Sequence, residues 1–269
     1  MKFDLDMSVA ERRNFIADCE LADRSHSLVD PVPHMNSPMA FSIEEPKEPQ
    51  SAAVAGGTLF GFTEGLSRQN KEDVDNSFLF ATLVANKAFN PETETQLWYG
   101  KFNQVLSTAG WLSFEWRYGK YRATQRRFSM DQVGLEILGS VIAAAALPGP
   151  ASLAMLKVAG DAVAALKKSE KPWRMFDQQT KTHQGGSFRV GACSEFKDGT
   201  VYVALGAVNF RAKSAVTNVL FWEWNDAEVD TYRGESNMVL NEGIYSGVRD
   251  LIRQKLGSNS QTGIMEFEI

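Results

Sequence analysis

Apolar residues recur at helical spacing in two segments of the first half of the chain. The first segment predicts a helix over 73–87. The second begins at Asn90, which is followed by a proline and an acid, and ends before Gly110. Residues 111–118 and 121–128 then alternate bulky and polar side chains, which predicts a β-hairpin.

Residues 132–167 predict a pair of apolar helices that meet at Pro148-Gly149-Pro150. The first arm is apolar on nearly every face, and the second has only Lys157 and Asp161 as charges before its basic end. A helix that is apolar on nearly every face must be buried, either in a protein core or in lipid. One interpretation is a central core hairpin whose small residues allow close helix approach. The other is a surface that lines a lipid cavity or transfers into a bilayer, although each arm of about 15 residues is shorter than a bilayer span.

The second half of the chain changes to strand patterns. Asp198-Gly199 predicts a tight turn between the second-half strands, and an amphipathic helix is expected over 241–256. Candidate strands lie at 187–193, 200–210, 217–224, 230–233, 237–240 and 264–269. This order has no βαβ alternation, so the predicted fold class is α+β, with the apolar helical hairpin packed on a mainly antiparallel sheet.

The first 50 residues differ in composition from the rest of the chain. Five of the nine prolines lie there, together with a run of charged residues, and they predict an extended arm with one short helix around 9–19. Residues 51–269 are expected to form a single α+β domain. Its glycine-rich start, near Gly56 and Gly57, lacks the spacing of a phosphate-binding loop.

Charge and cysteine usage exclude several classes of protein. The formal net charge is −5, with no long basic run, so nucleic acid is not expected as the main partner. Two cysteines and three scattered histidines predict neither a disulfide framework nor a metal site. The first residues lack the apolar core of a secretory signal. We therefore expect synthesis in the cytoplasm, with any release by a non-classical route.

Cys193 is the candidate reactive residue. It ends a predicted strand, where Gly191 and Ala192 leave space around its sulfur. A buried, inert thiol would also explain it, because free cysteines are among the most buried residues. A nucleophilic role requires a favoured thiolate, since a thiol with a pKa of about 8.5 is mostly protonated at neutral pH. His183 and Arg189 are the candidate helpers for that role.

The most basic stretch of the chain is a candidate membrane surface. It contains five cations and no acid, and several of the six tryptophans lie near it in the sequence. Such a surface suits anionic lipid headgroups. The alternative is the solvated outer face of a hairpin. The cations are Arg117, Lys120, Arg122, Arg126 and Arg127.

Several sequence blocks together resemble the Erwinia virulence factor (Evf) family, bacterial proteins of similar length linked to persistence in the insect gut. The likeness covers roughly residues 55–269. The blocks are FATLVANK at 80–87, WY at 98–99, VLSTAGW at 105–111, GAC at 191–193, LGA at 205–207, FWEW at 221–224, and MVLNE at 238–242 with Tyr245 and Val248-Arg249.

This resemblance implies a mixed α/β fold of complex topology, a palmitate carried as a thioester on one cysteine, and association with anionic membranes. Of the two cysteines only Cys193 lies in the resembling region, so the acyl site transfers to it and not to Cys19. Leaving a sixteen-carbon chain in water costs on the order of 10 kcal/mol, so it needs an apolar shelter. We expect that cavity to be lined by Leu135, Leu138, Val141, Ile142, Leu153 and Leu156.

The leading functional hypothesis is a lipid-modified, S-palmitoylated virulence or persistence factor that associates peripherally with membranes. Its partners would be a fatty acyl donor and an anionic membrane surface. We expect modification without turnover rather than an enzyme. The alternatives are a cysteine acyltransferase or thioesterase with an acyl-thioester intermediate on Cys193, and a pore-forming toxin that uses the 132–167 hairpin.

Overall fold

The structure is a computed structural model that describes residues 7–23, 48–123, 125–213, 216 and 218–269. Its helices are α1 (Val9–Asp18), α2 (Arg68–Ala88), α3 (Thr95–Ala109), α4 (Met130–Ala144), α5 (Gly149–Lys168), α6 (Glu170–Thr180), the 3-10 turn η1 (Asp226–Glu228), α7 (Glu242–Tyr245), α8 (Arg249–Leu256) and α9 (Ser258–Gly263). Its strands are β1 (Ser51–Ala55), β2 (Thr58–Phe62), β3 (Trp111–Lys120), β4 (Arg127–Ser129), β5 (Gly185–Glu195), β6 (Val201–Ala212), β7 (Glu223–Asn225), β8 (Val229–Leu240) and β9 (Ile264–Glu268).

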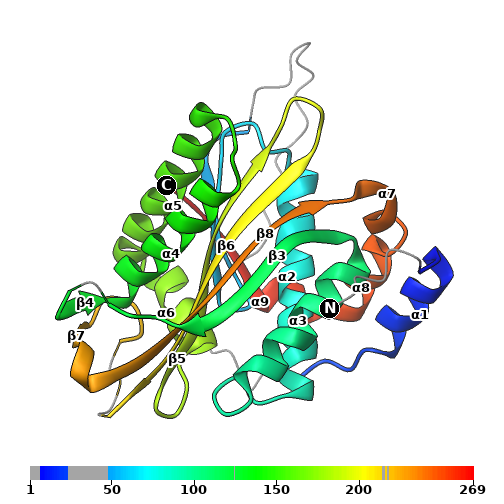
Figure 1. Ribbon diagram of the computed structural model, residues 1–269. Coiled ribbons are helices and arrows are strands. Elements are labelled where there is room, and N and C mark those ends of the chain that lie inside the picture. Colours follow the sequence, from blue (N-terminus) through cyan, green and yellow to red (C-terminus); the bar gives the residue numbers. More distant parts are fainter. Residues whose placement is uncertain (1–6, 24–47, 124, 214–215, 217) are drawn as a thin grey trace.

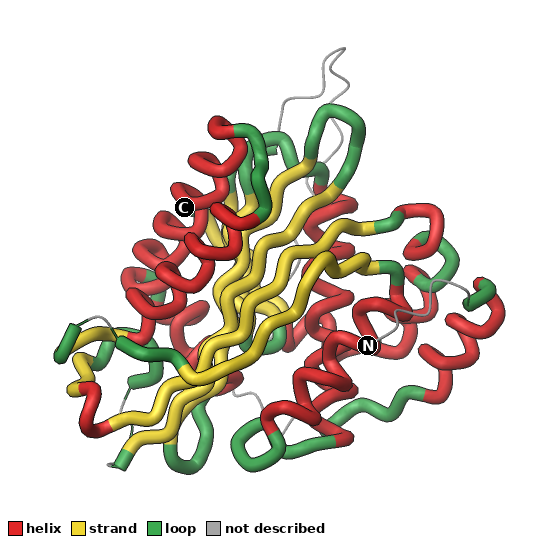
Figure 2. Tube along the Cα trace, in the orientation of Figure 1, coloured by secondary structure: helices red, strands yellow, loops and turns green. Residues whose placement is uncertain are grey.

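The molecule has three layers, with the sheet between two groups of helices (Figures 1 and 2). Within the described residues the main sheet has seven strands in the order β3-β8-β6-β5-β2-β1-β9. Only the β2–β5 ladder in it is parallel. The hairpin of α4 and α5 lies with α6 on one face, and α2, α3 and α8 lie on the other (Figure 1). The predicted α+β class, with an apolar hairpin on a mainly antiparallel sheet, is confirmed.

The sheet separates two apolar cores. The α2-side core includes Phe60 and Phe78 and is closed by α2, α3 and the C-terminal helices. The hairpin-side core includes Leu138, Val158 and Val190 and is closed by α4, α5 and α6. β1, β2, β5, β6 and β8 each contribute to both cores because successive side chains point to opposite faces.

Glycines at the sheet surface let the hairpin pack closely. A Cβ atom added at Gly61 of β2 would lie 2.7 Å from the backbone oxygen of Val158 in α5. One added at Gly206 of β6 would lie 2.9 Å from the backbone nitrogen of Leu138 in α4. The middle of each arm therefore rests directly on the sheet, as the core-hairpin interpretation expected.

The glycine-rich start of the domain is a β-hairpin. Gly56 and Gly57 connect β1 to β2 and both have positive φ, at 57° and 77°. Two consecutive residues of this conformation form the type of turn that suits the twist of a two-stranded ribbon. The sequence pattern identified the glycines but not the strand before them.

The hairpin predicted from residues 111–128 is wrong. β3 pairs instead with β8, more than a hundred residues later, and β4 pairs with β7. Charge explains the choice, because a local hairpin would bring cations of the basic stretch opposite one another. β8 instead places Glu235 opposite Arg117 and lets Asp230 form an ion pair with Lys120 at 2.8 Å.

Four other segments in the second half of the chain differ from expectation. Residues 170–180, for which no helix was predicted, form α6, because a proline is tolerated in a first helical turn and Met175 and Phe176 pack inward. Of the strand expected over 217–224, residue 217 lies outside the described residues, and among the others only 223–224 are in a strand, β7. The two strands expected at 230–233 and 237–240 are one continuous strand, β8. The helix expected over 241–256 is divided into α7 and α8.

The described part of the predicted N-terminal arm includes a docked helix. α1 confirms the short helix expected there, and Ile16 on it is fully buried. Arg12 donates hydrogen bonds to the backbone oxygens of Ser107 and Thr108 at the end of α3, at 3.2 and 3.0 Å. Residues 24–47, which contain four of the five arm prolines, lie outside the described residues.

Candidate functional site

Cys193 lies near the end of β5, on the face of the sheet that α2 covers. Its neighbours in register are Phe62 on β2 and Val203 on β6. The side chain is 0% exposed and belongs to the α2-side core. Its backbone oxygen accepts a hydrogen bond from the Thr63 amide at 3.0 Å. The thiol is therefore closed off from solvent.

Asp75 of α2 is a buried carboxyl group on the same side of the sheet. It is 1% exposed, and neither carboxyl oxygen has a hydrogen-bond partner. Burial raises the pKa of Asp75 well above its ordinary value, and the nearby charge of Glu266 raises it further. Burial also raises the pKa of Cys193, and the charge of Asp75 adds to that effect. The surroundings thus favour the protonated acid and the protonated thiol.

Ser51 adds a second buried polar group without a hydrogen-bond partner. It pairs with Phe62, which pairs with Cys193, so the three residues form one row across β1, β2 and β5 and project to the same face. At about 4.8 Å per strand, the Cα atoms of Ser51 and Cys193 are roughly 10 Å apart. The buried hydroxyl of Ser51 has no hydrogen-bond partner. We call Cys193, Asp75 and Ser51 the Cys193 site.

Aromatic rings fill the interior next to the site. The Phe60 ring contacts Phe78 of α2 edge-on, with centroids 4.9 Å apart, and stacks with Phe62 at 6.0 Å. Gly191 makes room for Phe60, because a Cβ atom at that position would lie 2.6 Å from its ring. The surroundings of the thiol are apolar and closely packed, apart from the unpartnered acid and hydroxyl.

Neither predicted helper of Cys193 acts on it. His183 is exposed, at the opposite end of β5. Arg189 is buried on the same face but four residues away, roughly 13 Å along the strand. Its guanidinium donates hydrogen bonds to Thr58 Oγ1 at 2.7 Å and to the Gly56 oxygen. Arg189 therefore fastens the β1–β2 turn, and nothing here favours a thiolate.

The predicted lipid cavity lies on the wrong face of the sheet for Cys193. Leu138, Val141 and Ile142 are buried in the hairpin-side core, where Leu135 packs partly buried, whereas Cys193 belongs to the α2-side core. Leu153 and Leu156 do not line an interior at all, since they are 69% and 39% exposed. The sheet itself separates the sulfur from these six residues, because Ala192 and Cys193 point to opposite faces.

The predicted basic membrane surface is divided between two elements. Arg117 and Lys120 lie on β3, and the Lys120 ammonium group pairs with Asp230. Arg122 and Arg126 are exposed in the following loop, and Arg127 is exposed at the start of β4. The structure brings Arg126 and Arg127 to the base of α4, the end of the hairpin far from its turn (Figure 1).

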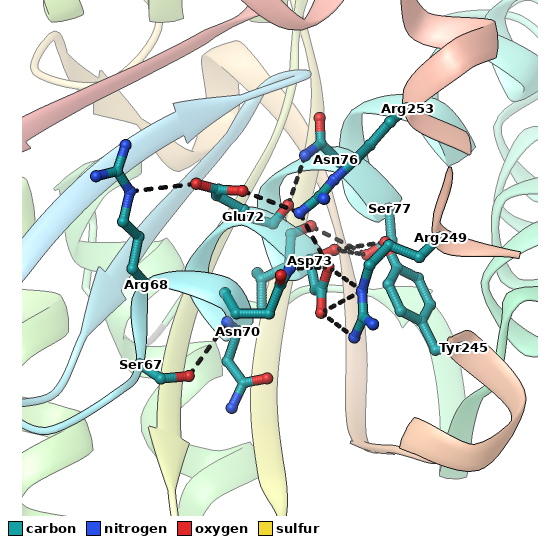
Figure 3. Close-up of polar contacts among 12 residues, drawn as sticks. Ser67, Arg68, Asn70, Glu72, Asp73, Asn76, Ser77, Tyr245, Arg249 and Arg253 are labelled. Atoms are coloured by element: carbon teal, nitrogen blue, oxygen red, sulfur yellow. Dashed lines mark hydrogen bonds and ion pairs between the residues drawn. The ribbon is translucent and has the colours of Figure 1, made fainter. Parts of the chain in front are cut away.

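A polar cluster at the start of α2 was missed by sequence reasoning (Figure 3). Arg249 of α8 donates to the fully buried Asp73 carboxylate from Nε at 2.9 Å and from Nη2 at 2.7 Å, and Nη2 also reaches Glu242 at 2.7 Å. The Tyr245 hydroxyl donates to the Asp73 backbone oxygen at 3.2 Å. The hydrogen bonds to Asp73 and Glu242 raise the pKa of Arg249. The cluster binds α2 to the C-terminal helices, and a carboxylate within the apolar pattern of α2 was its signal.

Two cavities among the described residues lie away from the Cys193 site, and these residues contain no candidate metal site. No group of three or more His, Cys, Asp or Glu side chains in the described part of the chain could hold a metal ion. One cavity, of about 330 Å³, lies between α1, α2 and α3 and is lined by Cys19, Lys87 and Lys101 among others. A second, of about 250 Å³, lies beside Tyr121, whose hydroxyl donates to Glu136 at 2.8 Å. Cys193 lines neither of them.

The chain matches no protein-family model and no curated protein. Solved structures similar to it include a delta-endotoxin, with 10% identity and a TM-score of 0.39 over 78% of this chain and 89% of that one. Another is the Evf virulence factor, with 13% identity and a TM-score of 0.30 over 75% of this chain and 82% of that one. Both scores are too low to assign a family or a function. The comparison establishes a distant likeness to these two structures, and membership of the Evf family stays a prediction.

Proposed function

We propose that this protein is a membrane-associated factor of the toxin or virulence type that carries a fatty acyl chain as a thioester on Cys193. One observation carries the proposal: a fully buried thiol shares the interior with a buried carboxyl group that has no partner for either oxygen. The resemblance to the Evf family implies that the chain is palmitate.

The buried carboxyl group of Asp75, which has no hydrogen-bond partner, supports the presence of an acyl group at the Cys193 site. A buried polar group without a hydrogen bond costs about 1–3 kcal/mol, so native interiors rarely keep one. The raised pKa of Asp75 makes its carboxyl group a hydrogen-bond donor, and the carbonyl oxygen of a thioester on Cys193 would be an acceptor for it. The neighbouring rings of Phe60, Phe62 and Phe78 would contact the methylene groups.

The acyl group would come from a thioester donor such as an acyl-coenzyme A. The Cys193 sulfur forms a bond to the acyl carbon, the bond from that carbon to the donor sulfur breaks, and the Cys193 proton goes to the departing thiol. The protonated carboxyl group of Asp75 would give its proton to the leaving sulfur and take up the Cys193 proton in its place, so that it ends the exchange protonated. No oxidant or metal ion takes part in this exchange.

Burial favours a stable modification over turnover. Hydrolysis of a thioester requires water at its carbonyl carbon, and Cys193 is 0% exposed. A transferase or thioesterase would have to open this interior in every cycle, so we place the enzyme alternative second. A thioester that survives purification supports modification, whereas burst kinetics with release of free acid supports catalysis.

The acyl chain would lie between the sheet and α2, and not in the hairpin-side core. The rings of Phe60 and Phe78 already fill the space next to Cys193, with centroids 4.9 Å apart. A sixteen-carbon chain therefore requires α2 to move away from the sheet. When α2 opens at a membrane, the chain would be released into the lipid.

Membrane association is proposed to be peripheral, because a single acyl chain gives only marginal anchoring and needs a second signal. Anionic headgroups that meet Arg122, Arg126 and Arg127 would supply it. Synthesis in the cytoplasm and release by a non-classical route remain part of the proposal.

Intact-mass measurement tests the proposal on the purified full-length chain. We expect an added acyl mass that hydroxylamine removes and that Cys193→Ser lacks. Cys19→Ser is the matched control, because Cys19 is also a mostly buried free cysteine and should leave the added mass unchanged. Wild-type protein from several expression hosts that shows only the unmodified mass would contradict the proposal.

A further inference from the structure

The turn between α4 and α5 and the helix ends beside it form an uncharged segment, residues 137–156, which we call the hairpin tip. This segment contains no Asp, Glu, Lys, Arg or His and lies between Glu136 and Lys157. Figure 1 shows the turn at the upper edge of the molecule, far from β4 and β7 at the base of α4.

The hairpin tip exposes large apolar side chains. Leu153 is 69% exposed and Leu156 is 39% exposed, and they are two of the five exposed large hydrophobic residues in the described part of the chain. Ala143, Ala144 and Ala146 are exposed beside them. The exposed surface of this stretch is therefore mostly apolar, and Ser140 is its one exposed polar side chain among the described residues.

Both hydroxyl groups of the hairpin tip donate hydrogen bonds to nearby backbone oxygens. The Ser140 hydroxyl donates to the Glu136 backbone oxygen at 3.2 Å, and the Ser152 hydroxyl donates to the Leu147 oxygen at 3.4 Å. Pro148 and Pro150 have no amide hydrogen to satisfy. Internal satisfaction of polar groups is what hydrocarbon surroundings demand of a chain.

The dimensions of α5 suit a bilayer. α5 has 20 residues, a mean hydropathy of 1.2 in its most apolar window, and only 33% of that window buried. At 1.5 Å per residue it is roughly 30 Å long, and its second half, from Val158 on, packs against the sheet, so only its first turns face outward with the hairpin tip. It is the one helix in the described residues that is long and apolar enough to cross a membrane.

We propose that the exposed face of the hairpin tip, with Leu153, Leu156 and the turn between α4 and α5, enters the hydrocarbon region of a phospholipid bilayer. A protein partner is less suitable, because protein interfaces take their energy mainly from Trp, Tyr and Arg, and the hairpin tip contains none of them. The inference extends the proposed membrane association but does not need the acyl group, since Cys193 lies on the other face of the sheet.

Vesicle flotation with the full-length protein tests the inference. The vesicles contain phosphatidylcholine alone or mixed with phosphatidylglycerol, and the variants are Leu153→Asp and Leu97→Asp. Leu97 is the matched control because it is 56% exposed on α3, on the opposite side of the sheet. We expect Leu153→Asp to lower the vesicle-bound fraction by about tenfold or more, and Leu97→Asp to leave it unchanged. Circular dichroism checks that both variants fold.

Two results would overturn the inference. One is wild-type protein that does not float with either vesicle; the other is Leu153→Asp that floats as wild type does. Cys193→Ser separates the two proposals: binding kept by Cys193→Ser and lost by Leu153→Asp assigns the contact to the hairpin tip. Binding lost only by Cys193→Ser assigns it to the acyl chain and contradicts the role of the hairpin tip.

Discussion

Asp75 and Cys193 are both enclosed between α2 and the sheet, and the charge of Asp75 raises the pKa of the Cys193 thiol. Neither oxygen of Asp75 has a partner there. An unpaired acid in a closed interior destabilises the fold unless it holds its proton. The pair is therefore a place where the chain gives up stability, as functional sites commonly do.

Replacement of Asp75 tests whether this residue destabilises the fold, because it should change how the free energy of unfolding depends on pH. The folded chain holds the Asp75 proton above the pH at which the unfolded chain loses it, because the folded pKa is raised. Over that window the folded state binds more protons, so the free energy of unfolding falls as pH rises through the folded pKa. Asp75→Asn should remove this fall and raise stability at neutral pH, as measured by urea unfolding at several pH values.

Asp198→Asn is the control for that experiment. Asp198 is an exposed aspartate in the β5–β6 turn whose pKa is lowered by hydrogen bonds from Thr200. Its replacement should leave the fall in stability unchanged. An Asp75→Asn protein with the same pH profile as wild type would show that Asp75 is not the responsible group.

Loss of Arg249 should be strongly destabilising. Arg249→Leu leaves the carboxylate of Asp73, which is 0% exposed, without the partner that bonds both of its oxygens. Breaking a buried pair from one side costs about 3–5 kcal/mol. Arg253→Leu, at a position 33% exposed, should cost about 1 kcal/mol or less. Chemical denaturation measures both, and equal losses would contradict the clamp role of Arg249.

Close packing of the hairpin on the sheet gives a second stability test. Gly61→Ala would place a methyl group 2.7 Å from the Val158 oxygen and should destabilise by about 1–3 kcal/mol. Gly160→Ala is its counterpart in α5, where nothing lies within 4 Å, and should stabilise by about 0.5–1 kcal/mol through helix propensity. Thermal unfolding of the two variants should move in opposite directions. A stabilised Gly61→Ala protein would mean that α5 does not rest on β2.

Local patterns predicted the elements that local contacts specify. The apolar hairpin, its stop at Pro148-Gly149-Pro150 and the turn at Asp198-Gly199 all depend on residues close in sequence, and all are present. The partner of β3 depends instead on charges in β8, which no local pattern reveals. That is why a sheet ladder was mistaken for a hairpin.

The surroundings of Cys193 also depend on contacts between segments far apart in the sequence, which local patterns do not predict. Alternation along β5 puts Cys193 and Val190 on opposite faces of the sheet, and their spacing in the sequence predicts this. The sequence does not say which helices cover which face, so the hairpin was assigned to Cys193 when α2 covers it. Asp75 was overlooked because an acid in a helical segment is ordinarily solvated, and only its burial makes it unusual.

The peptide that contains Cys193 provides the most direct test of the account. Mass spectrometry of a digest, with and without hydroxylamine, reads the state of this sulfur in the purified protein. The account predicts a fatty acyl mass on Cys193 that hydroxylamine releases, with Cys19 unmodified in the same sample. A free thiol at Cys193 in protein from every host, including protein supplied with acyl-coenzyme A during refolding, would contradict it.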